Sequence, residues 1–243
     1  MSTVLILGAS SDIGFAIAKK FASEKYDVQL AGRSVESLKA HQSDLQVRYQ
    51  VNCTLHSFDA MDFSTHASFY ESLSPKPDVT IYVIGYMNDN EKVISDWNES
   101  LRTIQTNYSG AVSILNIVAA DYAKKGKGTI VGISSVAGNR GRQSNYIYGS
   151  AKAAFTAYLS GLRNKLYHNG VHVMTVLPGF VNTKMTENLK LPAALTAQPE
   201  EVGEAVYNGV KKKKDVIYVK WFWKYIMKII TNIPEPMFKK KKL

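Results

Sequence analysis

Two kinds of segment alternate along the chain: short apolar runs rich in β-branched residues, and longer stretches with the spacing of amphipathic helices. Seven such runs, with no internal repeat and no long linker, predict a parallel sheet covered by helices on both faces. The expected fold is a Rossmann-type, doubly wound α/β domain whose ligand lies beyond the carboxyl ends of the strands. The predicted strands are 4–7, 28–31, 51–58, 79–84, 129–133, 171–177 and 216–219. The predicted helices are 13–23, 35–46, 63–73, 97–124, 148–168 and 199–213.

Charge divides the chain into two parts. Of the net charge of +10, residues 211–243 carry +9, because eleven lysines there face only Asp215 and Glu235. The 243 residues suit one large domain, so we expect a single α/β domain over 1–219 and a basic C-terminal extension over 220–243. A nearly neutral body argues against nucleic acid as a partner.

The single cysteine, Cys53, permits no internal disulfide and favours a reducing, cytoplasmic compartment. The first apolar run is short and no basic segment precedes it, so we interpret it as a strand and not as a signal peptide. His168 and His172 are four residues apart, but Gly170 interrupts the helix between them. We therefore predict no metal site.

The turn after the first strand is a candidate phosphate site. Gly8 and Gly14 allow a tight turn and close packing of helix on strand, and the free N–H groups at the helix start can bind phosphate. We interpret Asp12, in the middle of the turn, as a cap near the helix N-terminus. An ordinary strand-to-helix turn is the alternative. The residues predicted to contact the phosphates are Gly8, Ser10, Ser11, Asp12, Ile13 and Gly14.

The end of the second predicted strand indicates which dinucleotide would bind. Folds that prefer NAD usually place Asp or Glu there to hold the adenosine ribose, but this chain has Gly32, Arg33 and Ser34. An arginine followed by a hydroxyl suits a 2′-phosphate, which favours NADP; a solvated surface arginine is the alternative. Asp59, after the third strand, is a candidate contact on the adenine side.

Tyr148 and Lys152 are the candidate acid–base pair. They are four residues apart on one face of a predicted helix, where an ammonium group would lower the pKa of the phenol. Tyr207 and Lys211 have the same spacing. Only the first pair follows a strand that ends in a serine pair, 134–135, so we assign Tyr207 to the surface.

Taken in register, these features resemble the short-chain dehydrogenase/reductase family over residues 3–219. The motifs are Gly8-x5-Gly14, "TNYSG" at 106–110, Ser135, Tyr148-x3-Lys152 and "LPGFVNT" at 177–183. The resemblance implies an NADP(H)-dependent oxidoreductase that interconverts a carbonyl and a secondary alcohol by hydride transfer, assembled as a homodimer or homotetramer. A non-catalytic NADP-binding regulator and a membrane-surface adaptor acting through the basic tail are the alternatives.

The resemblance also implies roles for individual residues. Tyr148 would donate a proton to the substrate oxygen, Ser135 would polarise the carbonyl, and Asn107 would place a water between Lys152 and solvent. Lys152 would hold the nicotinamide ribose and lower the pKa of Tyr148. Further cofactor contacts are implied at Gly85, Pro178, Gly179, Val181 and Thr183. Leu7 and Asp12 depart from the family's glycine turn, and "YVIGYM" at 82–87 keeps only one residue of its Asn-Asn-Ala-Gly motif.

More distantly, "LGASSDIG", "VIGYMND" and "IPEPMFKKK" resemble the reductases that act on decaprenylphosphoryl-keto-pentose. This implies a lipid-linked keto-sugar or another lipid-like ketone as substrate. Residues 182–202 are irregular and contain several apolar side chains, so we expect them to form a substrate lid.

The tail has its own pattern. Lys220, Lys224 and Lys228 recur every four residues among aromatic and aliphatic side chains, over a stretch too short to span a bilayer. We interpret it as an interfacial helix drawn to anionic lipid at the inner face of the membrane. Packing on the domain or on a second subunit is the alternative.

Overall fold

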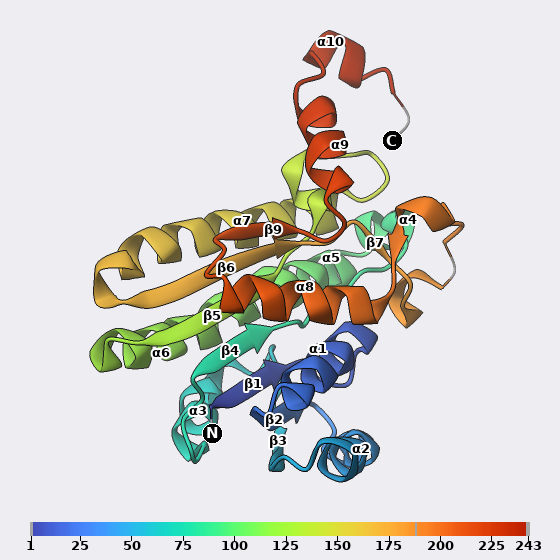
Figure 1. The fold of residues 1–243 in the computed structure, drawn as a ribbon. Helices are drawn as coiled ribbons and strands as arrows, with labels where there is room; N and C mark the ends of the chain where they lie inside the picture. The colour runs from blue at the N-terminus through green and yellow to red at the C-terminus, as the bar shows by residue number, and fades with distance from the viewer. Residues whose placement is uncertain (1, 188, 242–243) are drawn as a thin grey trace.

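The computed structural model describes residues 2–187 and 189–241, and its centre is one parallel sheet (Figure 1). The strand order is β3-β2-β1-β4-β5-β6-β9, and every pairing is parallel. The prediction of a seven-stranded, doubly wound sheet is confirmed. The strands are β1 (Thr3–Leu7), β2 (Asp27–Gly32), β3 (Cys53–Ser57), β4 (Val79–Tyr82), β5 (Gly128–Ile133), β6 (Val171–Leu177) and β9 (Val216–Tyr218).

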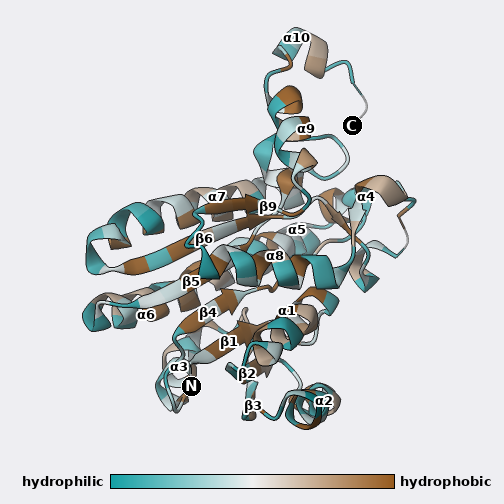
Figure 2. Cartoon of the chain, in the orientation of Figure 1, coloured by the Kyte–Doolittle hydropathy of each residue, from teal (hydrophilic) through white to brown (hydrophobic). Residues whose placement is uncertain are grey.

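Helices bury both faces of the sheet. In β1, Val4 and Ile6 face one apolar cluster while Leu5 and Leu7 face the other, and all four side chains are fully buried. This explains the continuous apolar runs in the sequence, since a strand buried on both faces need not alternate with polar residues. Figure 2 shows much of β1, β4 and β9 in brown, and several turns of α8 in teal. One face is covered by α1 (Asp12–Ser23), α2 (Lys39–Tyr49) and α8 (Pro199–Lys211), and the other by α3 (His66–Ser72), α6 (Gly110–Lys125) and α7 (Tyr146–Leu166).

The strand order reverses between β1 and β4, which are hydrogen-bonded neighbours although two strands separate them in the chain. At such a switch point the loops leaving the two strands diverge to opposite faces and open a crevice at the carboxyl ends. The turn after β1 and the segment after β4 therefore border the site that the fold provides.

Three details differ from the sequence-based prediction. The helix expected over 97–124 is two helices, α5 (Trp97–Ile104) and α6, joined by a π-helical turn at Gln105–Ser109. A short helix, α4 (Asn90–Ser95), was not predicted, because six residues are too few to show a helical period. Tyr207 is not on the surface: it is buried between α8 and α1, where its hydroxyl donates a hydrogen bond to Glu24.

The C-terminal extension forms α9 (Phe222–Thr231) and α10 (Glu235–Phe238), which project beyond the sheet in Figure 1. Trp223 and Met227 of α9 are buried against Val136 and Leu177. The sequence left open whether this helix packs on its own domain, on a second subunit or on a membrane. The structure shows that one side of α9 packs on its own domain. Within the described residues, no helix has the length and apolar character needed to cross a membrane.

Candidate active site

The turn between β1 and α1 depends on its two glycines. Gly8 has a φ of +99°, and a Cβ there would lie 2.8 Å from Cγ1 of Ile84. A Cβ on Gly14 would lie 2.3 Å from the carbonyl oxygen of Gly8. No side chain fits at either position, so the two glycines let this turn pack closely against Ile84 and against its own backbone.

Ser11, and not Asp12, caps the first helix. The Ser11 hydroxyl accepts a hydrogen bond from the Gly14 N–H at 3.0 Å and donates one to the Gly8 carbonyl at 2.8 Å. The interpretation of Asp12 as the cap was wrong. Its carboxylate instead accepts a hydrogen bond from the backbone N–H of Lys184 at 2.9 Å, because the shorter, nearer hydroxyl already occupies the capping position.

A cleft of about 340 Å³ opens beside this turn, at the switch point of the sheet. Most of the predicted cofactor residues line it, although they come from five separate stretches of the chain. The cleft thus joins the turn after β1, the end of β2 and the segment after β4 in one site. The predicted residues along it are Gly8, Ser10, Ser11, Asp12, Ile13, Arg33, Asp59, Gly85 and Thr183.

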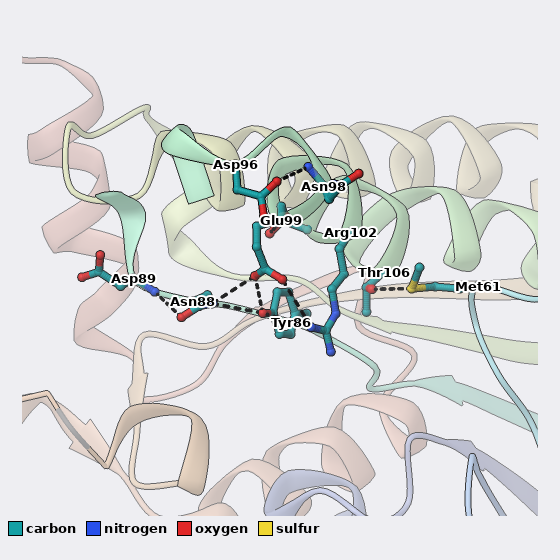
Figure 3. Close-up of polar contacts among 10 residues, drawn as sticks. Met61, Tyr86, Asn88, Asp89, Asp96, Asn98, Glu99, Arg102 and Thr106 are labelled. Atoms are coloured by element: carbon teal, nitrogen blue, oxygen red, sulfur yellow. Dashed lines mark hydrogen bonds and ion pairs between the residues drawn. The ribbon is translucent and has the colours of Figure 1, made fainter. Parts of the chain in front are cut away.

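Several lining residues were not predicted, among them Met61, Tyr86, Arg102 and Met185. Arg102 points from α5 toward the cleft and lies over the ring of Tyr86, with its guanidinium carbon 4.1 Å from the ring centroid (Figure 3). The Tyr86 hydroxyl donates to Glu99 at 2.5 Å, which fixes the ring. One signal in the sequence could have identified Arg102. It lies four residues, about one helical turn, before Thr106, which also lines the cleft.

The π-helical turn sets the position of Asn107. Its fully buried amide donates to the carbonyl oxygens of Tyr86 at 2.6 Å and Thr103 at 2.8 Å, and its oxygen accepts from the Tyr86 N–H at 3.2 Å. A widened turn of this kind frees backbone carbonyls and often marks a functional site. Asn107 therefore holds the segment that follows β4.

Gly85 connects the cleft to the predicted catalytic group. A Cβ on Gly85 would lie 3.2 Å from Oδ1 of Asn107 and 3.4 Å from Nζ of Lys152. The methyl group of Met185 would lie 4.0 Å away. Gly85 thus lies where the cofactor cleft, the lid segment and the buried lysine meet.

Lys152 is buried, and its Nζ donates to the carbonyl oxygen of Ile133 at 3.1 Å. Burial lowers the pKa of Lys152 to about 8, because few groups replace the lost hydration of the ammonium. Ser134 fixes this part of the helix, since its hydroxyl donates to the Lys152 carbonyl at 2.9 Å. The ammonium lies 5.8 Å from the centre of the Tyr148 ring.

Burial raises the pKa of Tyr148 to about 12, and the neighbouring Ser135 side chain acts in the opposite direction. The expected lowering of the tyrosine pKa is thus not what the structure shows: desolvation of the phenolate dominates. Ser135 begins a short helical turn, with its Oγ accepting from the Ala137 N–H at 3.1 Å. Neither Tyr148 nor Ser135 lines the 340 Å³ cleft.

The remaining predicted contacts have structural partners of their own. The Ser34 carbonyl accepts from the Ser37 hydroxyl at 2.7 Å, and the Pro178 carbonyl accepts from the Val136 N–H at 3.0 Å. Val181 is buried in a two-stranded ladder of β7 (Phe180–Val181) with β8 (Thr196–Ala197). A Cβ on Gly179 would lie 1.9 Å from the Trp223 indole, so packing of the C-terminal helix explains this glycine.

Across the described ranges, no three His, Cys, Asp or Glu side chains gather in a way that could hold a metal ion. Cys53 is buried, and burial raises the pKa of its thiol to about 12, which disfavours thiolate chemistry there.

Comparison with known proteins agrees with this geometry. The family model for short chain dehydrogenase matches residues 2–193. An uncharacterized oxidoreductase of Mycobacterium tuberculosis is 33% identical over 221 residues, covering 90% of this chain and 88% of the relative. One of Streptomyces coelicolor is 32% identical over 241 residues, covering 98% and 95%. A solved short-chain dehydrogenase from Sphingobium yanoikuyae, in complex with NADPH, has a TM-score of 0.83 at 24% identity, with 97% of each chain covered. Fold, site and relatives agree: the chain is a member of the short-chain dehydrogenase family of oxidoreductases.

Proposed function

We propose that this protein is an NADP(H)-dependent oxidoreductase that interconverts a carbonyl and a secondary alcohol. The observation that carries the proposal is the continuity of the site. The cleft has Arg33 at its β2 border and Gly85 at another, and a Cβ on Gly85 would lie 3.4 Å from Nζ of Lys152 and 3.2 Å from Oδ1 of Asn107. One elongated dinucleotide can thus extend from the Arg33 guanidinium at one end to the proposed acid–base pair, Tyr148 and Lys152, at the other.

The residues fit the cofactor. The turn after β1 lines the cleft at the start of α1, where backbone N–H groups can bind a pyrophosphate. Arg33 is exposed directly after β2, where it can pair with a 2′-phosphate. The NADPH complex of the structural neighbour supports the same choice. A bound nicotinamide would supply or accept the hydride.

Tyr148 is the proposed proton donor. With its pKa raised to about 12, the phenol is protonated at neutral pH and can give its proton to a carbonyl oxygen. Lys152, with a pKa of about 8, is still mostly charged there and can hold the ribose. Ser135 would bind the same carbonyl oxygen, and Asn107 would keep the segment after β4 in place.

The proposed substrate is a ketone with an apolar portion. Met185 and Leu189 of the expected lid segment expose 45% and 49% of their surface. An apolar portion of the substrate could cover these two side chains, whereas a fully polar substrate would gain nothing from them. A lipid-linked keto-sugar is one member of this class. The lid segment ends at Gln198, since α8 begins at Pro199.

We also propose a homodimer or homotetramer. Trp97, on α5, exposes 69% of its surface, and a second subunit would cover it. Light scattering of the purified protein measures the assembly directly.

The decisive experiment measures NADPH oxidation with a panel of ketones of increasing apolar size, lipid-linked keto-sugars included. Tyr148→Phe should lower turnover by on the order of 10²–10⁴-fold and leave NADPH affinity unchanged. Tyr207→Phe is the matched control, because it removes one hydroxyl from the other Tyr-x3-Lys pair. Tight NADPH binding with no turnover on any ketone would instead favour the regulator.

A further inference from the structure

The C-terminal helix α9 has two apolar faces, and the domain covers only one of them. Trp223 and Met227 are buried against the body. Trp221, Tyr225 and Ile229 expose 75%, 58% and 68% of their surface. At about 100° per residue, the mean directions of these two sets lie about 180° apart around the helix. A helix that only packs on its domain needs a single apolar stripe about 100° wide.

Lysines border the exposed face. Lys224 and Lys228 follow Trp221 and Tyr225 by three residues, which places them beside the outward apolar stripe. Both are exposed, and within the described part of the chain neither forms an ion pair, whereas Lys220 pairs with Glu201 at 3.1 Å. Residues 220–243 carry seven lysines against one acidic residue. In Figure 2, brown and teal turns alternate along α9.

The body of the domain holds this face in place through Arg140. Its guanidinium donates to the carbonyl oxygens of Ile230 at 2.7 Å and Ile233 at 2.6 Å, and pairs with Glu235 at 2.8 Å. It also lies 3.6 Å from the ring centre of Phe238. The only acidic residue of the extension is thus neutralised, and the outward face is ordered before it meets a partner.

We propose that this face, formed by Trp221, Tyr225 and Ile229 with Lys224 and Lys228, binds the surface of an anionic membrane. Tryptophan and tyrosine favour the headgroup level, and lysines beside them pair with lipid phosphates. A second protein chain would need a complementary apolar surface with acidic side chains placed opposite Lys224 and Lys228. An anionic membrane offers an apolar interior and negatively charged phosphates without any such fitted surface.

The helix that carries the proposed face also contacts the expected lid segment. The Trp223 indole N–H donates to the carbonyl of Leu195 in the lid segment at 3.2 Å, and Arg140 lies between Ser135 and Tyr148 in the chain. Docking itself does not depend on the proposed reaction.

Co-sedimentation of the full chain with vesicles tests the proposal. We expect binding to phosphatidylcholine vesicles that contain phosphatidylglycerol, little binding to phosphatidylcholine alone, and weaker binding at high salt. Lys224→Gln with Lys228→Gln should weaken binding about 25-fold, from about fivefold per lysine near an anionic surface. Lys212→Gln with Lys214→Gln removes the same charge elsewhere and should have little effect.

Trp221→Ser with Ile229→Ser should reduce binding by at least about tenfold, because burial of each side chain in the interface is lost. Val47→Ser is the control, since Val47 is 82% exposed on α2. NADPH affinity shows that each variant is folded, and vesicle binding can succeed even if no ketone is reduced. Equal binding by all variants, or a dimer in the ultracentrifuge that the serine variant abolishes without vesicle binding, would overturn the proposal.

Discussion

Asp12 and Lys184 lie 172 residues apart in the chain, yet a 2.9 Å hydrogen bond joins the Asp12 carboxylate to the Lys184 N–H. This bond links the turn after β1 to the segment after β7, and both residues line the cleft. The negative charge of Asp12 is thus directed to the backbone of Lys184.

The Asp12 bond should slow the departure of cofactor. Asp12→Asn removes the charge but keeps an oxygen that can accept from Lys184, whereas Asp12→Ala removes both. We expect NADPH to dissociate about fivefold faster from the alanine variant than from the asparagine variant, the value of one ordinary hydrogen bond. Stopped-flow fluorescence of bound NADPH measures both rates. Equal rates would show that this bond does not retain the cofactor.

Arg33 should determine the choice between the two nicotinamide cofactors. Arg33→Ala should weaken NADPH binding by about 10- to 100-fold and change NADH binding little, because only NADPH carries the 2′-phosphate. Arg102→Ala is the matched control, since it removes a guanidinium from the same cleft. We expect Arg102→Ala to leave the ratio of the two dissociation constants unchanged. Equal losses of NADPH and NADH in Arg33→Ala would contradict the NADP assignment.

Lys152 should lower the stability of the folded protein at neutral pH. Its pKa is 10.5 in the unfolded chain and about 8 in the folded one. Below pH 8 the buried ammonium is charged in the folded state, and its lost hydration lowers the free energy of unfolding. This cost falls as the pH rises from 8 to 10.5, because the folded state loses its proton first.

We therefore expect Lys152→Met to raise the free energy of unfolding at pH 7 by about 2 kcal/mol, after allowing for the lost bond to Ile133. The gain should shrink toward zero or below by pH 10.5, while turnover is lost at every pH. Urea titrations at both values test this, with the exposed Lys212→Met as control. A variant less stable than the wild type at pH 7 would refute the assignment of a burial cost.

Trp223 and Trp221 lie on opposite sides of one helix, which separates folding from docking. Trp223→Ala should lower the free energy of unfolding by about 3–5 kcal/mol, because it empties the space over Gly179. Trp221→Ala should change it by less than about 1 kcal/mol. Thermal unfolding of the two variants measures the difference. A matching loss in both would mean that the outward face is also structural.

Deletion of residues 220–243 would be a poor test of the tail. Trp223 and Met227 belong to an apolar cluster with Val136 and Leu177, and Arg140 would lose its partners. Truncation would therefore disturb the segment after Ser135 together with any surface function. Point substitutions on the outward face keep the two effects apart.

The sequence by itself determined the order of strands and helices and the fold class. Burial on both faces produces continuous apolar strands such as 4–7, and amphipathic helices repeat every 3.6 residues, so both signals are local. Tyr148 and Lys152 became candidates in the same way, because a spacing of four predicts a shared helix face, and both residues lie on α7. The glycine turn was also local, since Gly8 and Gly14 act within one connection.

Tertiary structure decided what depends on the distance between remote segments. The partner of Asp12, the place of Arg102 in the cleft and the packing of Trp223 on Gly179 all follow from how crossovers bring loops together. The raised pKa of Tyr148 belongs to the same group, because desolvation depends on every neighbour of the ring. Spacing along a chain names candidate residues, but only the packed molecule fixes their surroundings and hence their chemistry.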